Sequence, residues 1–129
     1  MRVALLTAVW SALVLASGTR ADEDSHGRFH AAYYQNWVNN DDNRCCNDHD
    51  CRELAAEDER TDGAGNLEVY VRGVGVAFGT AAWCRILPRH YLRRGNAPNW
   101  ASSHVCISTW YGGNTPCEQL ICYQPKPSG

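Results

Sequence analysis

CCNDHDC, residues Cys45 to Cys51, places three cysteines within seven residues. Cys45 and Cys46 are adjacent, and a bond between direct neighbours would strain the geometry that a disulfide prefers. Each of the two is therefore expected to bond to a distant partner. Four more cysteines follow downstream, namely Cys84, Cys106, Cys117 and Cys122. We predict that this stretch is a junction at which distant parts of the chain are cross-linked.

The chain has seven cysteines, so one is left over when six have paired, and the sequence does not choose among the connectivities. Cys84 is expected to be the unpaired one, because it stands alone after Trp83 in an apolar stretch that would bury an inert thiol. The leftover cysteine either stays free or bridges two chains in a disulfide dimer. The cysteines expected to form disulfides are Cys45, Cys46, Cys51, Cys106, Cys117 and Cys122.

The amino terminus has the pattern of a secretory signal. Arg2 is followed by an uncharged run from Val3 to Ala16, and then by small and polar residues. The run is too short to cross a bilayer, so we expect cleavage, after Ala21 or alternatively after Gly18. The prediction is a signal peptide over residues 1–21 and a mature domain over 22–129. All seven cysteines fall in that domain, which we place in the periplasm or outside the cell, where thiols pair.

Length and charge limit the class of protein. The 129 residues suffice for a single small domain. The 12 basic residues are scattered and are outnumbered by 14 acidic ones, so no basic surface for nucleic acid is expected. With the signal removed, no transmembrane segment remains in the sequence. We expect no cofactor.

Residue periodicity predicts an α+β domain. Phe29, Tyr33 and Trp37 stand four residues apart, which predicts an amino-terminal helix with one aromatic face. Apolar residues alternate from Leu67 to Val71, and again in the opposite parity from Val74 to Phe78, which predicts two short strands around Gly73. The segments 104–108 and 120–123 predict a carboxy-terminal hairpin. The expected fold is therefore one amino-terminal helix and an antiparallel sheet of three to five strands, stabilised by disulfides.

Within CCNDHDC, the order of Cys, His and Asp resembles the CCxxHDxC motif of the secreted, calcium-dependent phospholipase A-two family. The resemblance implies that His49 is a general base and Asp50 a calcium ligand. The chain departs from the motif at Arg52, where the family has cysteine, and residues 33–43 contain none of the glycines of the family's calcium loop. A calcium-dependent lipid hydrolase using His49 and Asp50 is therefore the alternative function.

A metal site is not expected. Cys45, Cys46, Cys51 and His49 do not have the paired spacing of zinc sites. His26 and His30 stand four residues apart but lack a third ligand in the sequence.

A longer resemblance covers most of the mature chain. The order YYQNW, CCNDHDC, RILP, SHVCIS and LICYQP is similar to a family of small, exported, cysteine-rich alphaproteobacterial proteins of unknown function. The resemblance implies a periplasmic or extracellular location and brings no activity.

No set of nucleophile, base and orienting residue can be assembled from the sequence. Trp100, Trp110 and Tyr111 stand in segments rich in Gly, Asn and Ser, where aromatic side chains serve recognition. We therefore expect a non-enzymatic binding or interaction module. Its partner would be an unknown component of the cell envelope or the extracellular space.

Overall fold

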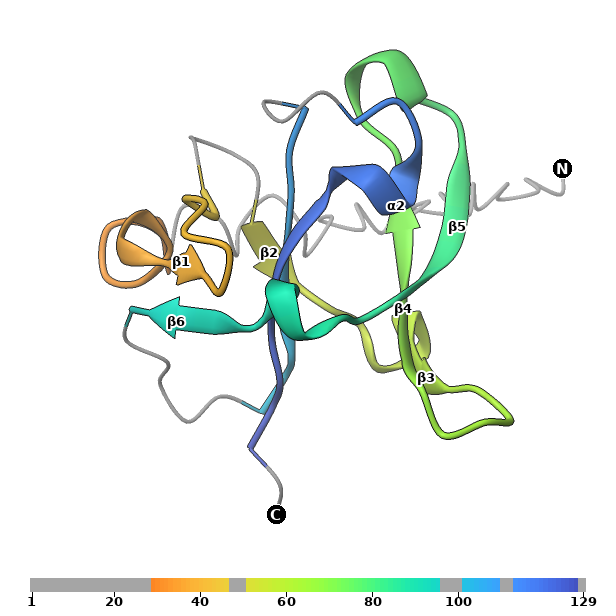
Figure 1. Ribbon diagram of the computed structural model, residues 1–129, viewed down its shortest axis with the longest axis horizontal. Helices are drawn as coiled ribbons and strands as arrows, with labels where there is room; N and C mark the ends of the chain where they lie inside the picture. The colour runs from red at the N-terminus through yellow and green to blue at the C-terminus, as the bar shows by residue number, and fades with distance from the viewer. Residues whose placement is uncertain (1–28, 47–50, 96–100, 110–112, 128–129) are drawn as a thin grey trace, which may run out of the picture.

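The structure is a computed structural model that describes residues 29–46, 51–95, 101–109 and 113–127. Within these residues the protein is mostly β, with three antiparallel sheets ordered β1-β6, β2-β7-β8 and β3-β4-β5 (Figure 1). The strands are β1 (Val38–Asn39), β2 (Cys51–Glu53), β3 (Glu59–Thr61), β4 (Leu67–Arg72), β5 (Ala81–Arg85), β6 (Leu92–Arg94), β7 (His104–Ile107) and β8 (Leu120–Gln124). The helical elements are the short α-helix α2 (Pro116–Gln119) and the 3-10 turns η1 (Tyr34–Asn36), η2 (Ala56–Asp58), η3 (Gly75–Ala77) and η4 (Pro88–His90).

The predicted α+β fold with an amino-terminal helix is wrong. In the described part of this segment, Phe29 and His30 are α-helical, and the chain then turns into η1. Tyr34 and Trp37, three residues apart, are the fully buried aromatic side chains there, a spacing that fits the three residues per turn of a 3-10 helix. Aromatic residues are weak helix formers, so burial of these two rings outweighs the four-residue pattern.

The sheet β3-β4-β5 confirms one predicted strand and corrects the other. Leu67–Arg72 forms β4, and its Val69 and Val71 are buried as the alternation predicts. The strand expected over Val74–Phe78 is absent. That segment contains η3, and the chain returns to the sheet only at β5. The parity change at Gly73 therefore marks the end of β4.

The predicted carboxy-terminal hairpin is confirmed. β7 and β8 pair antiparallel, with Cys106 opposite Cys122, and β2 joins the other edge of β7. The connection to β8 contains α2, which begins with a capping box: the Thr115 hydroxyl accepts from the N–H of Glu118, and the Glu118 carboxylate accepts from the N–H of Thr115. The four residues of α2 thus turn the chain so that β8 enters the sheet directly after them.

Three disulfides hold the domain, which confirms a disulfide-rich protein. They join Cys45 to Cys122, Cys51 to Cys106, and Cys84 to Cys117. The first two lie side by side, because Cys106 and Cys122 are direct partners on β7 and β8. Together with Tyr34 and Trp37 they form one of the two buried cores, and the other lies among Val69, Val71, Val105 and their neighbours.

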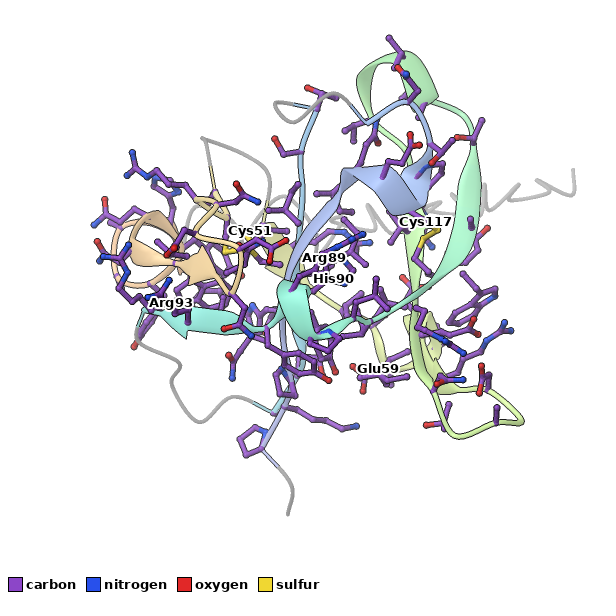
Figure 2. All side chains as sticks on the ribbon, in the orientation of Figure 1. Cys51, Glu59, Arg89, His90, Arg93 and Cys117 are labelled. Atoms are coloured by element: carbon purple, nitrogen blue, oxygen red, sulfur yellow. A yellow bond between two sulfur atoms is a disulfide. The ribbon has the colours of Figure 1, made fainter. Side chains whose placement is uncertain are left out.

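The expected cysteine assignment is wrong at two positions. Cys84 is bonded to Cys117, and this bond ties β5 to α2 (Figure 2). Cys46 is the cysteine that forms no disulfide, and it is buried, with its Sγ 3.5 Å from Nδ1 of His30. The alternative of a disulfide dimer would have to use this buried thiol. Cys84 stands apart from the other cysteines in the sequence, but this did not make it the unpaired one. Disulfide pairing depends on which distant segment lies beside each cysteine in the fold.

Candidate functional site

Several residues predicted to act lie outside the described part of the chain. These are His49 and Asp50, the predicted base and calcium ligand, and Trp100, Trp110 and Tyr111, the predicted binding surface. Both assignments stay predictions. Among the described residues, the candidate site is the connection between β4 and β5.

That connection, residues Gly73–Thr80, is called here the apolar loop. It lies beyond α2, at the top of the view in Figure 1, and it presents its largest side chains to solvent. Val76 is 79% exposed and Phe78 is 84% exposed, while Val74 is partly exposed. Tyr91, between η4 and β6, is the only other large apolar side chain that is exposed among the described residues, at 36%. Exposed apolar side chains that gather in one place mark interaction sites.

Backbone hydrogen bonds hold the apolar loop in one conformation. The N–H of Gly73 donates to the carbonyl of Thr80 at 2.8 Å, and the N–H groups of Ala77 and Phe78 donate to the carbonyls of Val74 and Gly75 at 3.1 Å. Gly75 has a φ of 56°, which favours glycine. The exposure of Val76 and Phe78 is therefore a property of an ordered loop.

Gln119 at the end of α2 anchors the base of the apolar loop. Its side chain is fully buried, Oε1 accepts from the N–H of Val74 at 2.9 Å, and Nε2 donates to the carbonyl of Val74 at 2.9 Å. Nε2 also donates to the carbonyl of Gly113 at 3.0 Å. One amide thus satisfies both backbone groups of Val74, as a neighbouring strand would. The Cys84–Cys117 disulfide fixes α2 itself to β5.

We expect Gln119→Ala to loosen this anchor and to lower the free energy of unfolding by about 2–4 kcal/mol, because three buried or part-buried backbone groups lose their partner. Urea denaturation measures the change. The matched control is Gln124→Ala, since Gln124 on β8 makes an exposed contact to the carbonyl of Pro125. It should change stability by less than about 0.5 kcal/mol. Equal effects of the two substitutions would show that Gln119 is no anchor.

A surface pocket of about 290 Å³ adjoins the apolar loop. It lies between the ring of Tyr70 on β4 and Phe78, with Gly79 and Ala81 completing its wall. Arg72 borders the pocket, and its guanidinium forms an ion pair with Asp58 at 2.9 Å. Phe78 therefore both lines this pocket and is exposed to solvent, next to the exposed Val76.

The described residues give no support to a metal centre. They contain no group of three or more His, Cys, Asp or Glu side chains placed to hold a metal ion. The zinc alternative at CCNDHDC is excluded for two of its four ligands, because Cys45 and Cys51 are bonded to other cysteines. None of the helices in the described ranges is long and apolar enough to cross a membrane.

Comparisons with protein-family models, with curated proteins and with solved structures found no match to this chain.

Sequence reasoning did not find the apolar loop as a surface. The segment GVGVAFGT alternates in the way of a half-buried strand, and this alternation predicted burial for Phe78. The available signal was the glycine content: Gly73, Gly75 and Gly79 within seven residues are unfavourable in a strand and typical of a turn.

Proposed function

We propose that the protein is an exported, non-enzymatic binding module, and that the apolar loop docks into an apolar pocket of a protein partner. The observation that carries the proposal is the exposure of Val76 and Phe78 on a loop held by its own hydrogen bonds and by Gln119. A preorganised contact loses little conformational freedom on binding, so its buried area converts efficiently into affinity.

Export to the periplasm or the cell exterior is supported by two observations. Residues 1–21 have the pattern of a cleaved signal. The three disulfides are the cross-links expected of a small domain in an oxidising compartment. The resemblance to small exported cysteine-rich alphaproteobacterial proteins points to the same location, and we propose membership of that family on the residues that carry it.

The charge distribution favours a protein partner over a lipid surface. The chain has more acidic than basic residues, and residues 73–84 contain neither Lys nor Arg. Arg72, at the base of the apolar loop, is paired with Asp58, and the nearby Glu118 is an exposed carboxylate. Stable attachment to an anionic membrane needs a basic patch beside the inserted apolar groups, and the described residues place none near this loop.

Thr109 and Gly113 both lie close to the apolar loop and its anchor. A Cβ added to Gly75 would stand 3.0 Å from the methyl group of Thr109, so these two residues are close. The carbonyl of Gly113 accepts a hydrogen bond from Nε2 of the anchor Gln119. Thr109 and Gly113 flank the segment that contains Trp110 and Tyr111. We therefore retain that pair as candidate contributors to partner binding.

The test uses Val76→Ser and Phe78→Ser, which remove apolar contact area from exposed positions. Each is expected to weaken partner binding at least tenfold, because burying such a side chain contributes about 1.5–3 kcal/mol. Stability should change by less than about 0.5 kcal/mol. Proteins of the native compartment that bind the immobilised mature chain are identified and purified, and their affinities for each variant are measured by titration calorimetry.

Tyr91→Ser is the matched control, since Tyr91 is also an exposed apolar side chain but lies outside the apolar loop. A partner that binds wild type and the control equally, and both loop variants weakly, supports the proposal. Partners insensitive to Val76→Ser and Phe78→Ser would refute it. Loop-dependent binding to vesicles of phosphatidylglycerol and phosphatidylethanolamine would show instead that the occupant is lipid.

A further inference from the structure

Strand β5 is an open edge of the sheet β3-β4-β5 among the described residues. Figure 1 shows it at the right-hand boundary of the coloured fold, with α2 on the side away from that boundary. The side chain of Cys84 on β5 is buried and is bonded to Cys117 of α2, so α2 packs against the buried face of the sheet. No strand of the described ranges pairs with the outer edge of β5.

The register of the sheet shows which backbone groups of β5 point outward. The N–H of Gly73 donates to the carbonyl of Thr80, and the N–H of Ile86 donates to the carbonyl of Leu67. Between these two bonds, antiparallel partners alternate between pairs that exchange hydrogen bonds and pairs that do not. The odd-numbered residues of β5 therefore direct their N–H and C=O groups away from β4. They are Ala81, Trp83 and Arg85.

These outward groups have no hydrogen-bond partner among the described residues. The carbonyl of Trp83 lies 3.8 Å from Sγ of Cys117, but this sulfur belongs to a disulfide and has no hydrogen to donate. Ala81 and Arg85, on either side of Trp83, are exposed. An edge of this kind accepts another strand, because the added strand satisfies a row of donors and acceptors at once.

β5 also lacks the features by which edge strands avoid pairing. Such strands are usually very short or carry proline, lysine or other charged residues. β3, the other edge of the same sheet, has three residues, and Glu59 and Arg60 are two of them. β5 has five residues, and its single charged side chain, Arg85, stands at its end. Of the two edges of this sheet, β5 is therefore the one suited to pairing.

We infer that two copies of this chain associate through β5, as an antiparallel pair related by a two-fold axis at Trp83. In this register Trp83 faces Trp83 of the second copy, and Ala81 faces Arg85 of the second copy. All three residues with outward backbone groups then bond to one another. In each of the two adjacent registers, one of them would face a residue beyond the end of the strand, either Gly79 or Leu87.

The outer face of the sheet complements a second copy in this register. Tyr70 and Trp83 are direct partners there, with ring centroids 5.3 Å apart, so pairing at Trp83 continues the aromatic row across the two-fold axis. Ala81 belongs to the wall of the 290 Å³ pocket beside Tyr70. The small Ala81 leaves this pocket open to the aliphatic stem of Arg85 of the second copy, which lies directly opposite. By symmetry, the same contact forms at both ends of the paired strands.

Charge does not oppose the association. Arg85 has the carboxylate of Asp62 at 3.8 Å, and Arg72, the other arginine beside Ala81, has that of Asp58 at 2.9 Å. Each positive charge near the contact thus has a negative charge of its own chain close by. The second copy supplies a large side chain opposite a small one without bringing an unpaired charge.

The experiment is sedimentation velocity of the mature, disulfide-bonded protein from about 1 to 500 µM, and a reversible dimer with a Kd of about 1–100 µM is expected. Ala81→Pro removes one outward N–H at an edge position, where proline breaks no bond to β4, and should weaken the dimer at least tenfold. Val76→Ser is the matched control. Val76 is also exposed but lies in the apolar loop, so its replacement should leave the dimer Kd unchanged.

Two further substitutions test the register through the sign of a charge. Ala81→Glu places a carboxylate opposite Arg85 of the second copy and should tighten the dimer about threefold to tenfold, because the new pair forms twice. Ala81→Arg places like charges opposite each other and should weaken the dimer by a similar factor. Both variants keep every backbone hydrogen bond between β4 and β5, and circular dichroism checks that each variant is folded.

Three results would overturn the inference. They are a monomer at every concentration up to about 500 µM, a dimer that Ala81→Pro leaves unchanged, and equal shifts of the dimer Kd in Ala81→Glu and Ala81→Arg. A dimer lost in Val76→Ser would place the contact on the apolar loop and would contradict it as well. Partner binding by the apolar loop is measured separately, so failure of one proposal is distinguished from failure of the other.

Discussion

Replacing both Cys45 and Cys122 with alanine is expected to lower the free energy of unfolding by about 4 kcal/mol. The bond joins residues 77 positions apart, and cross-linking so long a segment restricts the unfolded chain strongly. A domain of this size has only about 5–15 kcal/mol of net stability. The double variant should therefore be partly unfolded at 37 °C, as measured by urea and thermal denaturation under non-reducing conditions.

Cys46→Ala is the matched control for this experiment. Cys46 is adjacent to Cys45 and equally buried, but it forms no disulfide. Its replacement removes one small side chain and no cross-link, so the expected loss is about 1 kcal/mol or less. If Cys46→Ala were as damaging as the double variant, the assignment of the disulfides would be wrong.

Mild acid is expected to destabilise the protein by about 4 kcal/mol between pH 7.5 and pH 5. Burial lowers the pKa of His104 to about 3 and is the main cause lowering that of His90 to about 4. In the unfolded chain both rings titrate near 6.5, so the unfolded state binds more protons throughout this interval. The stability is complete above pH 6.5 and falls as the pH approaches the folded pKa values. Each ring accounts for about 2 kcal/mol of the stability lost at pH 5.

Burial explains why His104 stays neutral. Its Nδ1 is hydrogen-bonded to the Tyr34 hydroxyl at 2.6 Å, and both side chains are fully buried. Urea midpoints measured at pH 7.5, 6 and 5 give the profile. His104→Gln keeps a polar group there but cannot titrate, so its profile should lose about half of the slope. A midpoint that stays constant from pH 7.5 to pH 5 in the wild type would contradict the prediction.

Local sequence patterns predicted two kinds of element. These are strands whose buried and exposed side chains alternate regularly, and hairpins whose two strands are close in the sequence. Val69 and Val71 alternate with polar residues and are buried on β4, as predicted. The hairpin of β7 and β8 was predicted from two β-prone segments separated by a turn-rich connection. The presence of disulfides followed from the cysteine count and the signal pattern. These features depend on side-chain period and composition, which the sequence shows directly.

The candidate site was not predictable by the same means. Phe78 continues an apolar alternation, but the chain leaves the sheet at Gly73. Gln119, 45 residues beyond Val74, supplies to Val74 the hydrogen bonds that a paired strand would have made. No periodicity describes such contacts between distant segments.

From its residues alone, this protein is a small cysteine-rich domain with a β-hairpin at its carboxyl end. Three-dimensional packing decided that Cys46 and not Cys84 keeps its thiol, that the aromatic segment before it forms a 3-10 turn, and that Val76 and Phe78 face solvent. The reason is physical. Backbone period is a local property of the chain, whereas disulfide pairing and burial depend on which distant segments meet.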